Sequence, residues 1–292
     1  MQALSSDRPA RAALFASLID DAAVFPPRAA GLADAVREHA EHRRGPHAPL
    51  IGPLLVPVAA ATEAAFLLAR TPGSPVSLIA RPGAPVDGIP EAVARLTQAG
   101  VDVVGVELGW FEKWRDIDIQ GRRLALEVGR FDDPSARAEV LADIRRGAQA
   151  AGPATVAESG GPVVAKFRTG ATPTWAWPDE AELAGFLRAA VDAGVSLKLT
   201  GGLHHLVRAE HDGEPQHGLL NVLVAVHRAI AGDPASALAA VLAERDRSAL
   251  VRTVAALDPD QVRAVRDVFV SYGCCDVRDP IGELVDVGLV AG

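Results

Sequence analysis

Two lysines stand inside apolar stretches typical of buried strands, Lys166 in VVAKFRTG and Lys198 in VSLKLTGG. The chain contains 29 Lys plus Arg, and only three of these are Lys, so arginine serves almost everywhere that a cation is needed. An amine can lose its proton and attack a carbonyl carbon to form a Schiff base, which a guanidinium cannot do. Lys113 lies in the polar stretch FEKWRD and is expected to be solvated. Lys166 and Lys198 are therefore candidate nucleophiles.

Alternation of side chains along a strand predicts that both lysines point to the same side of a sheet. In the first stretch the apolar Ala165 and Phe167 share the face that should contact helices. Lys166 and Arg168 share the opposite face, and the same alternation turns Lys198 inward between two leucines. Adjacent strands lie about 5 Å apart. Crowding and burial should lower the pKa of these amines from about 10.4 toward 7 to 8, which makes neutral amine available.

The elements that must position these lysines alternate along the chain. Short β-rich apolar runs are separated by longer amphipathic segments rich in Ala, Leu and Arg, a pattern of βα units around a parallel sheet. Eight such strands and their helices close a (β/α)8 barrel, the TIM barrel, of roughly 250 residues. We expect residues 1–292 to form one such α/β domain, with both lysines near the carboxyl-terminal strand ends where barrels place catalytic groups. Candidate strands lie near residues 18–25, 51–57, 76–81, 101–107, 123–129, 163–169, 196–200 and 267–272.

A long segment separates the last two strands. Residues 203–266 predict a helical insertion on the barrel rim, with helices at Leu219–Ile230, Ala235–Arg245 and Asp260–Asp267. Helix starts are expected at the Asp-Pro pairs 133/134, 258/259 and 279/280, since Asp accepts a hydrogen bond from the first turn and Pro suits the first helical position.

Inward carboxylates are expected beside the lysines. Asp20 and Asp21 have opposite parity, so one of them faces inward in either register, and Glu127 shares the inward face of its strand. Asp102 and Glu107 also have opposite parity, so a regular strand turns only one of them inward. Two interpretations stay open. The carboxylates are acid/base partners of reactive amines, or they form ion pairs that only hold the barrel together.

The motifs around the lysines resemble a known family. KFRTG, followed 32 residues after its lysine by KLTGG, resembles the deoxyribose-phosphate aldolase family of Schiff-base aldolases, which carries Lys-x-x-Thr-Gly on strand six and Lys-x-x-Gly-Gly on strand seven. LIDD at 18–21, VDVV at 101–104 and SYGCC at 271–275 resemble its strands one, four and eight more coarsely. KFRTG and GLHH also resemble a set of uncharacterised bacterial proteins, which implies no activity.

This resemblance assigns roles to individual residues. It implies that Lys166 is the Schiff-base lysine and that Lys198 is the neighbour that lowers its pKa. It implies that Asp102 is the acid/base partner acting through water, a role for which Glu107 or Glu127 is the alternative.

The start of the last helix changes which substrate we expect from the resemblance. In the family, backbone amides near the Gly-Gly bind a phosphate, which makes Thr169, Gly201 and Gly202 candidate substrate-binding residues. Asp276 and Asp279 at the start of the last helix would repel a phosphate. We therefore expect a small carbonyl compound without a phosphate.

Further side chains are candidates for recognising this substrate. Arg168 either clamps a substrate carboxylate by a two-pronged contact or pairs with a barrel carboxylate. His204 and His205 follow the glycines, and either imidazole could bond the substrate or act as general acid/base, because it titrates near neutrality. Their spacing does not predict a metal site. His39 and His42 lie in the polar stretch REHAEHRR and are expected to be solvated.

Three functions are compatible with these residues. The first is a lyase that forms a Schiff base through Lys166 and makes or breaks a carbon-carbon bond, or dehydrates. The second is a metal-dependent lyase or hydrolase using His204 or His205 with Glu127 or Asp20. The third is a non-catalytic small-molecule binding protein, in which a carboxylate locks Lys166 and the barrel mouth is filled.

Composition excludes several classes of partner. A net charge of −8 and a pI near 5.5 argue against nucleic acid and anionic membranes, which need a basic surface. No apolar run long enough to span a membrane and no secretory signal is visible, so we expect a cytoplasmic protein without a resident cofactor. Cys274 and Cys275 are expected to be reduced. Trp175 and Trp177 either cover a ligand or form a contact in a homo-oligomer.

Overall fold

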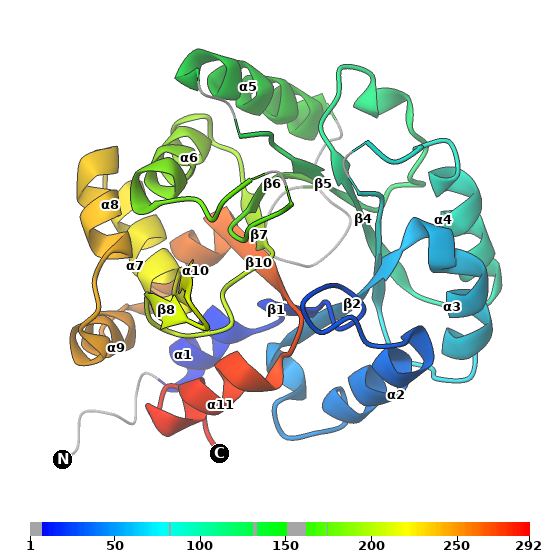
Figure 1. Cartoon of the computed structure of the whole chain (residues 1–292), viewed down its shortest axis with the longest axis horizontal. Coiled ribbons are helices and arrows are strands. Elements are labelled where there is room, and N and C mark those ends of the chain that lie inside the picture. The colour runs from blue at the N-terminus through cyan, green and yellow to red at the C-terminus, as the bar shows by residue number, and fades with distance from the viewer. Residues whose placement is uncertain (1–7, 82, 131–132, 151–161, 174) are drawn as a thin grey trace.

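The computed structural model of the chain describes residues 8–81, 83–130, 133–150, 162–173 and 175–292. Eight parallel strands form a closed barrel in the order β1-β10-β7-β6-β5-β4-β3-β2, which confirms the (β/α)8 architecture (Figure 1). The strands are β1 (Ile19–Asp21), β2 (Ile51–Pro57), β3 (Val76–Ile79), β4 (Val103–Gly109), β5 (Arg123–Glu127), β6 (Val163–Arg168), β7 (Leu197–Thr200) and β10 (Phe269–Cys274).

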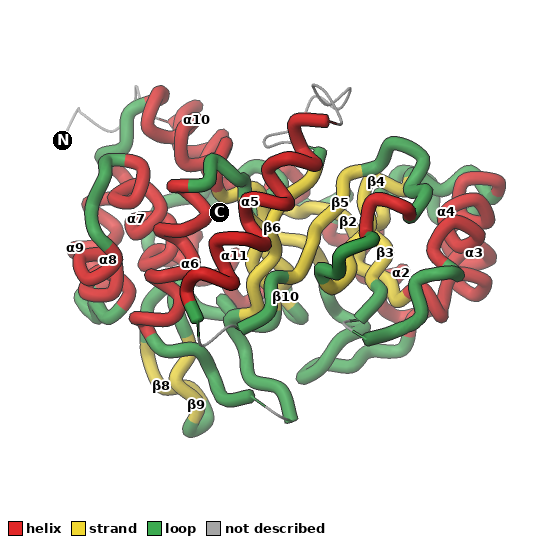
Figure 2. The backbone as a smooth tube through the Cα atoms, turned by 90° about the horizontal axis from the view of Figure 1, so that it is seen from above, coloured by secondary structure: helices red, strands yellow, loops and turns green. Residues whose placement is uncertain are grey.

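Helices surround this barrel (Figure 2). In the helix that precedes β4, the buried residues Ile89, Ala92, Val93 and Leu96 recur at helical spacing, so they form a single apolar stripe. The helices are α1 (Arg8–Phe15), α2 (Leu32–His42), α3 (Ala61–Leu68), α4 (Ile89–Gln98), α5 (Pro134–Ala150), α6 (Glu180–Asp192), α7 (Leu219–Ile230), α8 (Ala235–Leu242), α9 (Arg247–Ala255), α10 (Pro259–Val268) and α11 (Arg278–Asp286).

Two of the three predicted Asp-Pro helix starts are confirmed. Helix α5 begins at Pro134, and α10 begins at Pro259 behind an Asp258 side chain that accepts a hydrogen bond from the Gln261 amide. The prediction for the third pair is wrong, because α11 begins at Arg278 and takes Asp279 and Pro280 into its first turn. A proline is tolerated there, since the first amides of a helix have no partner within the helix.

The segment between β7 and β10 contains more than the predicted helices. An antiparallel hairpin, β8 (Ala209–His211) and β9 (Glu214–Gln216), comes before α7 and projects from the end of the barrel that carries the loop after β6 (Figure 2). The predicted helix Ala235–Arg245 ends at Leu242, and α9 follows as a separate, unpredicted helix. Helix α8 packs on α6 and α7, while α10 packs on α1 and α7.

The core divides according to which way each strand residue points. The large core lies between the barrel and the helices, and it includes Leu54 and Val56 of β2. Leu55, between them, belongs instead to a small apolar group on the inward face of the strands. A second small group consists of Ala125, Val164 and Val270. Much of the remaining inward face is polar and includes the buried charged residues Asp20, Glu107, Lys166 and Lys198.

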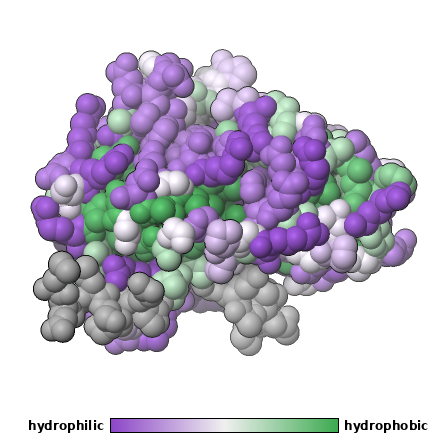
Figure 3. Space-filling view, turned by 90° about the horizontal axis from the view of Figure 1, so that it is seen from below, coloured by the Kyte–Doolittle hydropathy of each residue, from purple (hydrophilic) through white to green (hydrophobic). Residues whose placement is uncertain are grey.

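The surface is mixed in character. Seen from below, hydrophilic residues predominate at the margins, and hydrophobic residues cross the middle of the view (Figure 3). The large hydrophobic side chains that stand exposed in the described ranges are Phe66, Trp175 and Ile230. Over these same ranges, no helix combines the length and the apolar character that a membrane span needs.

Candidate functional site

Strand alternation places both lysines inside the barrel. Lys166 on β6 and Lys198 on β7 are direct neighbours in the parallel register, and they are 2% and 5% exposed. Of the two acidic pairs, Asp20 on β1 and Glu107 on β4 are the members that face inward, and both are buried. The sequence had left each of these positions open between two acidic residues of opposite parity.

Glu107 lies between the two lysines and contacts both. Its Oε2 is 3.0 Å from Lys166 Nζ, and its Oε1 is 2.5 Å from Lys198 Nζ. The Ser77 hydroxyl donates to the same Oε1 over 3.5 Å. Burial raises the pKa of Glu107, but the charges of Lys198 and Lys166 outweigh it and hold the pKa at about 2. Glu107 is therefore ionised and links the two amines.

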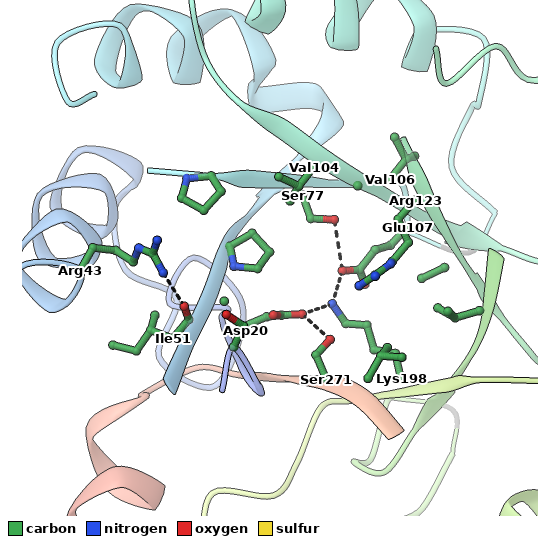
Figure 4. A pocket seen from close by; sticks show the side chains of 18 residues that line it. Asp20, Arg43, Ile51, Ser77, Val104, Val106, Glu107, Arg123, Lys198 and Ser271 are labelled. Carbon is green, nitrogen blue, oxygen red and sulfur yellow. Dashed lines mark hydrogen bonds and ion pairs between the residues drawn. The ribbon is translucent and has the colours of Figure 1, made fainter. Parts of the chain in front are cut away.

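Lys198 has a second carboxylate partner. Its Nζ donates to Asp20 Oδ2, which also accepts the Ser271 hydroxyl over 2.9 Å (Figure 4). Burial lowers the pKa of Lys198, but Asp20 and Glu107 raise it by more, so the pKa stands above its ordinary value. Burial also raises the pKa of Asp20. The expectation that crowded amines lose their protons is wrong for Lys198, because carboxylates surround its ammonium group.

Ion pairs link Lys166 to side chains nearer the carboxyl-terminal end of the barrel. Its Nζ lies 3.1 Å from Glu127 Oε2, and Glu127 Oε1 lies 3.4 Å from Arg168 Nε. The exposed fraction of the side chain is 3% for Lys166, 11% for Glu127 and 32% for Arg168. Two ion pairs that share Glu127 thus connect Lys166 to the partly exposed Arg168, and of the two roles expected for Arg168 the pairing with a barrel carboxylate is observed.

Asp102 does not belong to this group. It is exposed and lies just before β4, where its carbonyl oxygen accepts the Val76 amide over 2.8 Å. Glu107, five residues further along the same strand segment, occupies the inward position beside both lysines. A regular strand can turn only one of these two parities inward, and burial of an acid beside two buried cations favours Glu107.

The ends of β6 and β7 approach each other closely, and glycines permit it. A Cβ added to Gly170 would lie 1.6 Å from the Gly201 carbonyl oxygen, and one added to Gly202 would lie 2.8 Å from Thr169 Oγ1. Gly201 has a φ of +78°, a conformation that glycine adopts without strain, and a Cβ there would lie 2.8 Å from Arg168 Nη1. These candidate binding residues therefore lie together beside the Arg168 guanidinium.

His204 and His205 contact other parts of the fold. His204 Nδ1 lies 3.6 Å from Cys274 Sγ and 3.8 Å from Cys275 Sγ, and burial lowers the pKa of this imidazole. His205 Nδ1 lies 2.7 Å from Glu283 Oε1 on α11. In the part of the chain that the structure describes, no three His, Cys, Asp or Glu side chains are arranged to hold a metal ion. The residues of the metal-dependent alternative thus fall into separate groups.

One buried histidine contact was missed by the sequence analysis. Asp21, which points away from the barrel interior, has Oδ2 at 3.1 Å from His39 Nδ1 and 3.6 Å from His42 Nδ1. Burial raises the pKa of Asp21, but the bonds to the two histidines lower it to about 2. The expectation that His39 is solvated is wrong, since it is 0% exposed. The signal was its place on the same helix face as Val36.

Comparison with known proteins gives few matches. A scan against protein-family models finds none, and neither does a search of curated proteins. Among solved structures, the chain is similar to a tetrameric deoxyribose phosphate aldolase from Aeropyrum pernix, with 14% identity, a TM-score of 0.39, and coverage of 98% of this chain and 100% of that chain. It is also similar to a protein assigned as a phosphonomutase from Burkholderia cenocepacia J2315, with 18% identity, a TM-score of 0.33, and coverage of 76% and 80%. Agreement this weak says nothing about activity, which rests on this chain's own residues.

Proposed function

We propose that the chain is a lyase that forms a Schiff base between Lys166 Nζ and a small carbonyl compound without a phosphate. The observation that carries this proposal is the contact of Lys166 with two carboxylates, Glu107 and Glu127, near the carboxyl-terminal end of the barrel. Each carboxylate can accept a proton from the ammonium group, and barrels of this class place their chemistry at that end.

The reaction begins with a proton transfer. Lys166 gives a proton to Glu107 or Glu127, and the neutral amine then attacks the carbonyl carbon to form a carbinolamine. The protonated carboxylic acid returns its proton to the departing hydroxyl, so that water leaves and a cationic iminium remains. This iminium withdraws electrons from the neighbouring carbon, which permits a carbon-carbon bond to break or form there.

Lys166 is preferred to Lys198 as the nucleophile because of what surrounds each amine. Lys198 is held by Asp20 and Glu107, both buried, and its pKa is raised. Lys166 connects through Glu127 to the partly exposed Arg168. A carbonyl compound that enters from the carboxyl-terminal end therefore meets Arg168 first, where the guanidinium can bind a substrate carboxylate, and then Lys166.

The start of α11 supports a substrate without a phosphate. Asp276 lies just before this helix, and its side chain accepts hydrogen bonds from the Arg278 amide over 3.1 Å and the Arg278 guanidinium over 2.8 Å. The bonds to Arg278 lower the pKa of Asp276, although burial opposes them. Asp276 thus already occupies the first amide of α11, and Asp279 adds a second carboxylate in the first turn, which together oppose the binding of a phosphate at the helix N-terminus.

Borohydride trapping tests the covalent step. The protein is incubated with a panel of small aldehydes and keto acids, reduced, and digested for peptide mass spectrometry. The chain has only three lysines, so Lys113→Arg removes the exposed amine as a control, and Lys166→Arg and Lys198→Arg form a matched pair that keeps both charges. We expect one adduct, on Lys166, which Lys113→Arg retains and Lys166→Arg loses. Absence of a Lys166 adduct with every carbonyl compound would exclude the mechanism.

One observation favours a second candidate, a non-catalytic binding protein. Two carboxylates hold Lys166 at salt-bridge distance, which is the arrangement expected of an ion pair that only stabilises the barrel. Calorimetric binding of a carboxylate ligand that is weakened by Arg168→Gln, together with no borohydride adduct, would assign this function.

A further inference from the structure

A cavity of about 110 Å³ penetrates the barrel from its amino-terminal end. Its outer lining consists of residues that precede or begin strands, among them Ser17 before β1 and Pro75 before β3. Its inner end is formed by Asp20, Glu107 and Lys198 (Figure 4). The cavity thus reaches the buried ion pairs from the end opposite to the partly exposed Arg168.

The walls of the cavity suit water better than an apolar ligand. Ala125, Val164 and Val270 line the passage, while the Ser77 and Ser271 hydroxyls lie at the inner end on the two carboxylates. A single buried water needs roughly 10–15 Å³ and two to four polar partners. The cavity therefore has room for several waters, and the polar groups that would bind them lie both at the ion pairs and at Ser17, Arg43 and Arg123 along its lining.

We propose that this cavity is the route by which the ion pairs exchange protons with solvent, while substrate enters from the carboxyl-terminal end. The inference rests on the proposed Schiff-base function, because it assigns the path of the proton that Lys166 must lose. Lys166 is 2% exposed, so this proton leaves through a neighbour. A substrate bound at Arg168 covers the Glu127 side, which leaves Glu107 and Lys198.

The proton balance along this path is simple. Glu107 accepts a proton from Lys166, Lys198 gives one of its own protons to Asp20, and Glu107 then passes its proton to Lys198. Asp20, whose pKa is raised by burial, releases the proton to water in the cavity. Glu107, Lys198 and Asp20 regain their charges, and one proton has moved from Lys166 to water. The same path run in reverse protonates Glu107 again, so that it can give a proton to the departing hydroxyl of the carbinolamine, and formation of the iminium releases no net proton. Asp20 also holds the Lys198 ammonium group at the inner end of the cavity.

Access to the cavity is tested with substituted cysteines. In a Cys274→Ala, Cys275→Ser background, Val270→Cys places a thiol on the cavity wall, and Val226→Cys places one in the main core on α7. Both valines are at most 3% exposed, so the two thiols differ in access to the cavity and not in surface exposure. We expect methyl methanethiosulfonate to label Val270→Cys at least 10-fold faster. Equal rates would show that the cavity is closed and would overturn the proposal.

The role of the cavity is tested by blocking it. Val104 lines the cavity near the start of β4, so Val104→Phe should fill the entrance and Val104→Ala is the matched control. We expect borohydride trapping of Lys166 to be at least fivefold slower in Val104→Phe, with the same final yield, and unchanged in Val104→Ala. Val164→Leu narrows the passage further in and should slow trapping if Val104→Phe does not fold.

The outcomes separate this inference from the proposed function. Trapping at the wild-type rate in a variant whose Val270→Cys thiol no longer reacts would overturn the proton route and leave the Schiff base intact. A wild-type protein that forms no Lys166 adduct would exclude the Schiff base, and the labelling of Val270→Cys would still report whether the amino-terminal end is open.

Discussion

The barrel interior and the rim after β7 both gather titratable side chains, but they couple them differently. In the interior, Glu107 contacts Lys166 and Lys198, and all three are at most 5% exposed. On the rim, the paired side chains of His205 and Glu283 are 27% and 23% exposed. Coulombic interactions are far stronger where water is excluded. Charged groups therefore make a tightly coupled network in the interior and separable contacts on the rim.

The largest effect should come from removing the shared carboxylate. Glu107→Gln leaves two buried ammonium groups with fewer partners, and we expect the free energy of unfolding to fall by about 3–5 kcal/mol. Glu283→Gln, its counterpart on the rim, should cost about 1 kcal/mol or less, because its partners reach solvent. Urea unfolding of both variants measures the difference. Equal losses would show that the interior pairs are no more strongly coupled than those on the rim.

Burial of a histidine on the rim makes the free energy of unfolding depend on pH. His217 is 1% exposed and its Nε2 bonds the Pro178 carbonyl over 2.9 Å. Burial and the Arg208 charge lower its pKa to about 4. The unfolded chain binds the proton first, so stability is full above about pH 6.5 and falls by about 3 kcal/mol as the pH drops toward 4.

His217→Gln tests this dependence, because it removes the titrating group. The variant should lose about 3 kcal/mol of the difference in unfolding free energy between pH 7 and pH 4. Protonation of Asp21 and Glu107 also lowers the stability, but their pKa values are about 2, so this loss occurs at lower pH. It should be unchanged in the variant. A variant with the wild-type slope between pH 4 and 7 would refute the assignment.

Substitution of two glycines compares backbone crowding at the barrel strand ends with that in the rim hairpin. Gly170→Ala forces a Cβ against the Gly201 carbonyl, so we expect a loss of about 1–3 kcal/mol by thermal or urea unfolding. Gly213 in the hairpin has a φ of +78° and nothing within 4 Å of an added Cβ, so Gly213→Ala should cost only about 1 kcal/mol of backbone strain. A larger loss of stability for Gly213→Ala than for Gly170→Ala would mean that the strand ends separate more readily than the hairpin bends.

The smallest effect is expected where two imidazoles stack. The rings of His205 and His211 have centroids 3.4 Å apart at an angle of 11°. His211→Ala removes this contact and should cost about 0.5–1 kcal/mol, felt in the hairpin alone. Faster hydrogen exchange in residues 209–216, with unchanged exchange in β6 and β7, would support this. Glu210→Ala on the same hairpin is the control, because its side chain is exposed.

The barrel was predictable because its signals are local and repeated. Each expected strand region overlaps an observed strand, and alternation correctly turned Lys166 and Lys198 inward. Helix starts were predictable where an Asp side chain caps the first turn, as at Asp258. The hairpin β8–β9 and helix α9 were missed, because short elements on a rim are specified by their neighbours more than by their own periodicity.

The site was predictable only in part. Parity alone required one acid of the pair Asp20 and Asp21 to face inward, and one of Asp102 and Glu107. It could not choose between them, since the choice depends on register with the neighbouring strands. His39 shows the same limit, because its partner Asp21 lies 18 residues away and comes into contact only when α2 packs on the barrel.

The sequence by itself determined that two amines face into a parallel barrel, since side-chain alternation is a property of every strand. Only the tertiary structure decided what those amines meet. Closure of the barrel brings β1 and β4 to β7 and places Glu107 between the lysines, which raises the pKa of Lys198 where the sequence predicted a fall. The physical reason is that a pKa depends on the charges within a few ångströms, and these come from strands that are distant in the chain.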